Sequence, residues 1–248
     1  MDSLQEKELF DRVSVSWMKK DLVSYCREAR KLRLFQTLAN APASMGRVLE
    51  VGCGAGFSAR YLHGRYDVFT GIDISPRLIE LAREHNMAPN RNFHAVDITG
   101  WSLSDRFDVI FMIGVLHHLP RPVAALERLG EMLAPGGMVA VNEPLRGNPL
   151  VGFVRRVRKR VDKAYSPDQI TFSPGELARI FRQAGFETTI RQQGILTTPF
   201  AETVFTPESV GDLLVAALSR LDPVLEWAVD ATRLPLAWNM VAEGRLGE

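Results

Sequence analysis

Val48-Leu49-Glu50-Val51-Gly52-Cys53-Gly54-Ala55-Gly56 is the stretch that decides the fold of this 248-residue chain. Its first four residues suit a short buried strand, and a helix is expected to follow the glycines through Leu62. Glycines at such a turn let the backbone approach a ligand closely and leave N–H groups free at the start of the helix. The stretch therefore predicts a strand–turn–helix unit that binds a nucleotide-like ligand.

The spacing of the glycines narrows the class of ligand. A dinucleotide-binding turn would place its third glycine at position 57, which is Phe57 here. Glu50, inside the strand, would serve a phosphate group poorly, whereas a ligand with a sulfonium or ammonium charge tolerates a carboxylate. Taken alone, the turn could also be a structural connection without a ligand.

Strand-like and helix-like segments alternate outward from this unit, as in a doubly wound α/β sheet. Besides the helix through Leu62, helices are expected to start at Pro76 and to cover 122–133 and 174–185. Strands are expected over 48–51, 68–74, 93–96, 107–115, 138–142, 186–191 and 236–242. The fold class is therefore α/β, a doubly wound, seven-stranded, mostly parallel Rossmann-like sheet with helical cap segments at the N-terminal and C-terminal sides.

Local signals set several of these boundaries. Ser75-Pro76 is typical of a helix start, and Ser173-Pro174-Gly175-Glu176 reads as a capping box. Ala134-Pro135-Gly136-Gly137 is expected to end a helix and turn the chain before the fifth strand. The inward face of the helix that starts at Pro76 is expected to hold Leu78, Leu81, Ala82 and His85.

Three regions fall outside the alternation. Residues 1–44 are expected to form a helical lid, with Leu34 and Leu38 on an apolar stripe, and residues 45–248 the main domain. Insertions at 144–172 and 194–235 are expected to cap the acceptor side of the domain. The clearer helix of the second insertion carries Val210, Leu213, Leu214, Ala217, Leu218 and Leu221.

The composition sets outer limits on function. The chain is 46% hydrophobic and 24% charged, and its net charge of +1 argues against a dedicated nucleic-acid binder. Cys26 and Cys53 match no metal-ligand spacing and are read as reduced thiols. The polar N-terminus does not resemble a secretory signal, and no apolar run approaches the ~20 residues that span a bilayer. We expect a cytoplasmic protein without a metal.

The motifs in order resemble those of class I S-adenosylmethionine-dependent methyltransferases of the small-molecule type. Residues 48–56 resemble the family's first motif, Gly71-Ile72-Asp73-Ile74-Ser75 the second and Val96-Asp97-Ile98 the third. Residues 107–110 with 114–119 resemble the fourth, and residues 133–137 the turn before the fifth strand. The resemblance covers about residues 45–192 and implies that S-adenosylmethionine is the cofactor.

The resemblance also implies roles for individual residues. Glu50 and the glycine turn would place the methionine part of the cofactor, Asp73 both ribose hydroxyls and Asp97 the adenine amino group. Phe10-Asp11 followed by Trp17 resembles a segment that covers the methionine end, although core packing explains Trp17 equally well. The cofactor-binding residues expected are Glu50, Gly52, Cys53, Gly54, Gly56, Asp73, Ile74, Asp97, Ile98 and Trp17.

Three residues at strand ends are candidates for a catalytic base. His117 and His118 follow the fourth strand, at the edge where open α/β sheets bind ligands, and histidine takes protons near pH 7. Glu143 ends the fifth strand and faces the same cleft. Loop fixing is the alternative for both histidines, and a capped turn before Pro144 is the alternative for Glu143.

Residues 153–163 carry six basic side chains and an apolar row at helical spacing. A solvated helix packed on the domain explains this pattern, as does a peripheral contact with a membrane or an acidic partner. The segment favours an amphiphilic or anionic small-molecule acceptor that receives the methyl group on a hydroxyl, an amine or an activated carbon. The alternatives are a nicotinamide-dependent oxidoreductase and a non-catalytic membrane- or partner-binding protein on the same fold.

Overall fold

The computed structural model describes residues 3–101, 105–149, 152, 171–204, 207–232 and 234–247. In this part of the chain one sheet has the strand order β3-β2-β1-β4-β5-β7-β6. The parallel strands are β1 (Arg47–Val51), β2 (Val68–Asp73), β3 (Arg91–Ala95), β4 (Phe107–Ile113) and β5 (Leu133–Pro144). β7 (Asn239–Leu246) runs antiparallel to both β5 and β6 (Phe186–Gln193). The predicted seven-stranded, mostly parallel sheet is confirmed.

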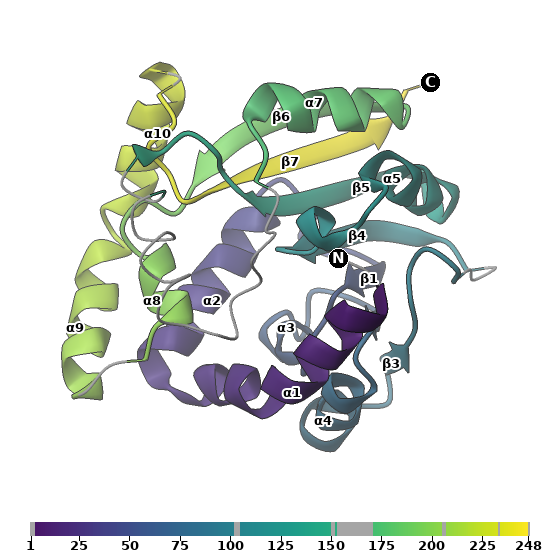
Figure 1. The fold of residues 1–248 in the computed structure, drawn as a ribbon, viewed down its shortest axis with the longest axis horizontal. Coiled ribbons are helices and arrows are strands. Elements are labelled where there is room, and N and C mark those ends of the chain that lie inside the picture. Colours follow the sequence, from purple (N-terminus) through teal and green to yellow (C-terminus); the bar gives the residue numbers. More distant parts are fainter. Residues whose placement is uncertain are drawn as a thin grey trace.

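Helices cover both faces of the sheet (Figure 1). α2 (Ser24–Thr37), α3 (Phe57–Tyr61) and α4 (Pro76–Asn86) pack on one face, and α5 (Pro122–Glu131) and α7 (Pro174–Gln183) on the other. α1 (Ser3–Leu22) precedes α2, and α8 (Thr198–Glu202), α9 (Glu208–Leu218) and α10 (Asp222–Thr232) lie beside the sheet. A short 3-10 helix, η1 (Leu116–His118), follows β4.

The central strands are buried on both faces. Val48 and Val109 belong to the core under α2–α4, whereas Leu49 and Ile110 belong to the core under α5 and α7. All four side chains are fully buried, and each contributes roughly 1.5–3 kcal/mol through burial. The sheet is therefore a rigid platform, and the chain changes winding direction between β1 and β4, where open α/β sheets form a ligand crevice.

The start of α4 agrees with the sequence, but one residue of its inward face does not. The Ser75 hydroxyl accepts a hydrogen bond from the Leu78 N–H, and Pro76 takes the first helical position. His85, expected to face inward, is 41% exposed, so that prediction is wrong. Asn86 is buried instead, because its side-chain amide donates to the Ala55 carbonyl at 2.7 Å.

The turn expected at residues 134–137 lies inside β5. α5 ends at Glu131, and β5 already pairs with β4 at Leu133 before the register shifts. Gly136 has φ +75°, and a Cβ at Gly137 would lie 2.9 Å from the Ala134 carbonyl oxygen. The two glycines therefore form an irregularity in a longer strand rather than a connection between a helix and a strand.

The cap regions depart most from the sequence pattern. The apolar row at 210–221 lies largely outside the core, with Leu213 72% exposed, while Gly211 and Val215 are buried. Gly211 faces the Tyr25 ring of α2, which leaves no room for a side chain at that position.

The capping box at Ser173 and Glu176 is confirmed at the start of α7. The basic segment 153–163 lies outside the described residues, so the membrane contact stays a prediction. Among the helices that the structure describes, none combines the length and the apolar character needed to cross a membrane.

Candidate active site

A cavity of about 880 Å³ runs along the carboxyl ends of the strands, beneath α1. Its lining follows the sheet order, from Asp97 after β3 through Asp73 and Gly52 to Pro144 on β5 and Asn239 on β7. The volume lies in the upper part of the range of about 300–1,000 Å³ that is usual for small-molecule sites. The cavity can therefore hold a cofactor together with a second molecule.

The glycine turn forms one wall. The N–H groups of Gly52 and Cys53 both donate to the Ile72 carbonyl, at 2.8 and 3.0 Å, which fixes the turn against β2. Gly52 and Gly54 line the cavity and have φ values of +73° and +53°. A Cβ at Gly54 would meet nothing within 4 Å, so the backbone there is open to a ligand.

Three predicted cofactor residues lie behind this wall rather than on it. Cys53 is buried, and its sulfur occupies the space that a Cβ at Gly71 would need. Gly56, at φ +75°, begins α3 against the Phe93 ring. The buried Glu50 accepts a hydrogen bond from the Ser58 hydroxyl at 2.7 Å through Oε1, and its Oε2 has no partner among the described residues. Burial, reinforced by the nearby Asp73, raises the pKa of Glu50 well above its ordinary value.

Two predicted acids do line the cavity, each beside a predicted apolar neighbour. Asp73 Oδ2 accepts from the Gly54 N–H and Oδ1 from the Ser75 N–H, both at 2.9 Å. Burial outweighs these bonds and raises the pKa of Asp73 to about 6. Asp97 accepts from the Thr99 N–H and hydroxyl at 2.9 and 2.8 Å. Ile74 and Ile98 complete this half of the lining.

His117 and Glu143 form a buried pair. His117 Nδ1 lies 2.6 Å from Glu143 Oε2, while Glu143 Oε1 accepts from the N–H groups of Val115 and Leu116 at 3.1 and 2.7 Å. A carboxylate at this position favours the tautomer that carries its proton on Nδ1. His117 Nε2 is then an acceptor; it is buried, has no partner among the described groups, and belongs to a residue that lines the cavity. Glu143 is itself fully buried behind His117.

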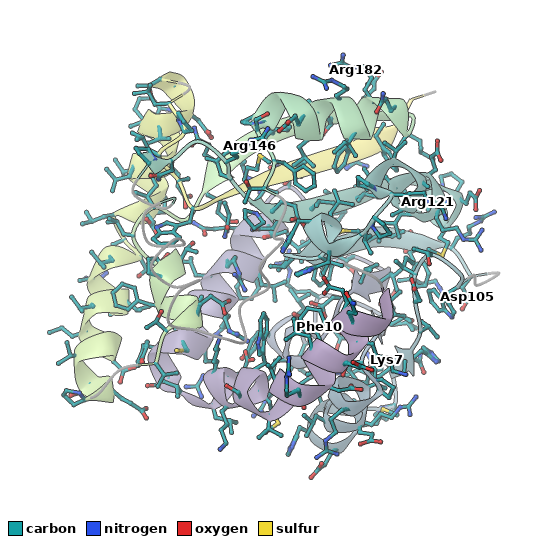
Figure 2. The ribbon with its side chains drawn as sticks, in the orientation of Figure 1. Lys7, Phe10, Asp105, Arg121, Arg146 and Arg182 are labelled. Carbon is teal, nitrogen blue, oxygen red and sulfur yellow. The ribbon has the colours of Figure 1, made fainter. Side chains whose placement is uncertain are left out.

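His118 contacts α1 instead. Its Nδ1 lies 3.0 Å from Glu6 Oε1, and its ring packs edge-on against Phe10 with 5.4 Å between centroids. Figure 2 shows Phe10 extending from α1 near the centre of the molecule. Trp17, further along α1, lines the cavity, packs edge-on against Phe10 and is 41% exposed. Both aromatic rings therefore cover the cavity rather than fill a closed core.

The polar contacts of α1 hold it over the cavity. Asp11 accepts hydrogen bonds from the Ser75 hydroxyl and the Arg77 N–H, at the start of α4. Glu6 is buried against His118, and Lys20 pairs with Glu202 of α8 at 3.0 Å. Lys20, Arg33 of α2 and Glu202 also line the cavity, and no sequence motif predicted any of the three. Helical spacing of Glu6, Phe10, Trp17 and Lys20 on α1 could have identified that helix's share of the lining.

The residues present fit S-adenosylmethionine, which the motif resemblance implies. Asp73 and Asp97 are acceptors suited to ribose hydroxyls and to an adenine amino group, and Gly54 leaves open space beside them. Glu50 Oε2, buried behind the turn, is a polar atom without a hydrogen-bond partner among the described residues. Among the described residues, no cluster of three or more His, Cys, Asp or Glu side chains is arranged to hold a metal ion.

Comparisons with known proteins agree with this geometry. A family model described as a methyltransferase domain matches residues 23–190. The ubiquinone biosynthesis O-methyltransferase of Thiobacillus denitrificans is 29% identical over 172 residues, which cover 65% of this chain and 73% of that protein. The trans-aconitate 2-methyltransferase of Methylobacterium nodulans is 36% identical over 110 residues, which cover 43% of this chain and 42% of the relative.

A solved structure extends the likeness to the whole fold. A SAM-dependent methyltransferase from Thermotoga maritima, described as a possible histamine N-methyltransferase, superposes with a TM-score of 0.66 at 20% identity, covering 97% of this chain and 99% of that one. Neither the nicotinamide-dependent alternative nor the non-catalytic one is favoured by these matches. Because the family match spans more than half of the chain, the protein belongs to the methyltransferase-domain family and is a class I S-adenosylmethionine-dependent methyltransferase of the small-molecule type.

Proposed function

We propose that the enzyme methylates a hydroxyl group of its small-molecule acceptor and that His117 is the general base. The observation that carries this proposal is the unpartnered Nε2 of His117, with Nδ1 held by Glu143 at 2.6 Å. A hydroxyl must lose a proton as it accepts a methyl group, so a positioned base accelerates the reaction. The relative named as an O-methyltransferase supports the same choice of acceptor.

Glu143 is a positioning residue in this mechanism. It accepts backbone hydrogen bonds from Val115 and Leu116 and holds His117 through Nδ1, so the end of β5 fixes the loop after β4. This arrangement keeps the lone pair on Nε2, where it takes the proton of the acceptor hydroxyl.

The cofactor half of the cavity has a separate set of roles. S-adenosylmethionine would supply a methyl group carried on a sulfonium, whose loss gives a neutral thioether. Asp73 would hold the ribose hydroxyls, Asp97 the adenine amino group, and the backbone from Gly52 to Gly54 the methionine part. Ile74 and Ile98 would provide the apolar surface for the adenine and ribose. Most of the catalytic effect then comes from aligning the two reactants, which a rigid sheet edge does well.

Residues near the turn and on α1 complete the assignment. Glu50 supports the turn from behind through the hydrogen bond that it accepts from Ser58, while Cys53 and Gly56 maintain the shape of the turn. Residues 1–44 form the lid, with α1 as the moving part and Trp17 over the methionine end, and His118 fastens that lid through Glu6. The family match begins at residue 23, which leaves α1 outside it. A helix that closes over the reactants excludes water from the transfer.

The test combines an acceptor screen with one variant. Deuterium-labelled S-adenosylmethionine is incubated with phenols, hydroxybenzoates, aliphatic hydroxy acids and matched amines, and mass spectrometry locates the label. His117→Asn keeps a side-chain N–H for Glu143 and removes the base. We expect kcat to fall by roughly 10²–10⁴-fold, with unchanged affinity for S-adenosylhomocysteine.

The exposed His85 supplies the matched control, since His85→Asn makes the same chemical change away from the cavity. Its kcat should stay within twofold of wild type. Label found only on amine nitrogens, or a His117→Asn enzyme that keeps wild-type kcat on a hydroxyl acceptor, would rule out the proposal.

A further inference from the structure

Three cations converge on one carboxylate at the wall of the cavity. Glu202, on α8, lies 3.0 Å from Lys20 Nζ and 3.5 Å from Arg30 Nη2 through Oε2, and 3.3 Å from Arg33 Nη2 through Oε1. Asp21 is the second acid of this group and pairs with Arg30 at 2.6 Å. The group therefore carries three positive and two negative charges, which leaves one net positive charge.

The two arginines of the group are not equivalent. Arg30 is fully engaged, because its Nε also donates to the Ala201 carbonyl at 3.0 Å. Arg33 has a single ion-pair contact, with Glu202, and its buried Nε has no partner among the described groups. Arg33 lines the cavity, whereas Arg30 does not. The excess charge of the group thus lies on the residue that faces the ligand space.

Glu202 cannot neutralise the remaining positive charge of this group, because it is already ionised. Burial alone would raise the pKa of Glu202, but attraction to Arg30, Arg33 and Lys20 lowers it to about 2, so Glu202 is already a carboxylate. Burial lowers the pKa of Arg33, yet a guanidinium stays charged at neutral pH. A partly buried cation without a full set of acceptors is costly. An anion arriving in the cavity would remove that cost.

Charge is divided along the cavity. The half under β2 and β3 contains Asp73 and Asp97, which suits a cationic methyl donor, and the half under α2 and α8 contains Lys20 and Arg33 with Glu202. Arg121, another cation of the lining, is exposed and follows η1 (Figure 2). We propose that the methyl acceptor carries an anionic group, a carboxylate or a phosphate, that binds to Arg33 and Lys20. This inference rests on the proposed function, since it takes the α2–α8 half of the cavity as the acceptor site.

The experiment uses matched probes on the full-length enzyme saturated with S-adenosylhomocysteine. Benzoate and benzamide have the same size and differ in charge, and inorganic phosphate tests the other anion. Each is titrated at constant ionic strength set with chloride, by calorimetry and by the fluorescence of Trp17 and Trp238, which line the cavity. We expect benzoate or phosphate to bind at least tenfold more tightly than benzamide, and the tighter of the two identifies the anion class.

Variants then assign the charge to Arg33. Arg33→Gln should weaken binding of the preferred anion by roughly ten- to hundredfold, as expected for the loss of a charge-assisted contact. The affinity of this variant for benzamide should equal that of wild type. Arg33→Lys keeps the charge but not the planar fork, so it should retain a preference for the anion. Arg27→Gln is the control, because Arg27 is on the same helix, is 42% exposed and pairs only with its neighbour Glu28 among the described residues.

Two binding results would overturn the inference. One is wild-type enzyme that binds benzoate and phosphate no better than benzamide, a comparison that needs no variant and so stands if Arg33→Gln does not fold. The other is a folded Arg33→Gln that binds the anion as wild type does. Methyl transfer to hydroxyls without preference for anionic acceptors would remove this inference alone, whereas loss of the role of His117 would leave anion binding intact.

Discussion

Asp73 gives the sharpest prediction, because its environment couples cofactor affinity to pH. Its carboxylate is 8% exposed, and burial raises its pKa to about 6 despite the N–H groups of Ser75 and Gly54. Ribose hydroxyls donate to the ionised carboxylate, so binding requires the proton to be absent. Affinity is therefore full about one pH unit or more above this pKa and falls as the pH drops through 6.

The magnitude follows from this pKa. With a pKa of about 6, the dissociation constant of S-adenosylhomocysteine should rise about tenfold as the pH falls from 7.5 to 5. An aspartate with the ordinary pKa would raise the dissociation constant by only about 10% over the same range. Asp73→Asn should bind roughly ten- to hundredfold more weakly at pH 7.5, through loss of charge-assisted hydrogen bonds. The dissociation constant of the variant should not show this tenfold dependence on pH.

Thermal stability distinguishes a role of Asp73 in cofactor binding from a role in maintaining the fold. A rise in pKa from 3.8 to about 6 means that the ionised group costs the unliganded fold about 3 kcal/mol. Below about pH 4 the carboxyl group is protonated in both the folded and the unfolded chain, so the fold does not bear this cost. The fold loses this stability as the pH rises through 6 and the buried group ionises. Asp73→Asn removes the buried charge, so Tm at pH 7.5 should be unchanged or higher although affinity falls.

The assay is calorimetric titration at four pH values with thermal denaturation alongside. Glu80→Gln is the control, because Glu80 is 61% exposed on α4 and pairs with Arg77. Wild-type affinity that is constant from pH 7.5 to pH 5, or an Asp73→Asn protein that binds like wild type, would refute the reasoning.

The remaining predictions concern the turn, the buried pair and a helix start. Gly52→Ala should prevent stable folding, because a Cβ would lie 2.3 Å from a Val115 methyl at φ +73°. Gly54→Ala has space and should cost roughly 1–2 kcal/mol for the left-handed backbone, while calorimetry shows at least a tenfold loss of S-adenosylhomocysteine affinity. Glu143→Ala should destabilise the fold by about 2–4 kcal/mol in urea denaturation, since it leaves buried N–H groups unsatisfied; a smaller loss would mean that water replaces the carboxylate. Ser173→Ala removes the capping box of α7 and should lower Tm by about 2–4 °C without changing ligand affinity, and an affinity change would contradict a purely local role.

The sequence predicted what is decided over a few neighbouring residues. Glycines after a buried strand define the turn at Gly52 and Gly54, and Ser75-Pro76 defines the start of α4, because each depends on local backbone preferences. The regular alternation of segments then predicted the sheet. His85 was misplaced because both 85 and 86 fit the helical period, and a hydrogen bond from Asn86 to the distant Ala55 decides between them.

What the sequence did not predict depends on segments that meet only in the folded chain. Lys20, Arg33 and Glu202 come from three helices and have no common motif. Glu143 was expected to face the cleft, but its position depends on the backbone N–H groups of Val115 and Leu116, which follow β4. The apolar row of α9 looked like a buried face until the Tyr25 ring placed Gly211 inward instead.

The way α1 is attached has a consequence for catalytic turnover. Its buried side chains are polar, and Glu6, Asp11 and Lys20 attach it to three separate elements through hydrogen bonds and ion pairs. Each such bond has a net value of only about 1 kcal/mol, since water replaces it when the helix lifts. Opening breaks these bonds without disturbing the strands, so products can leave without unfolding of the sheet edge. Salt weakens ion pairs of this kind, and product release should accelerate as ionic strength rises.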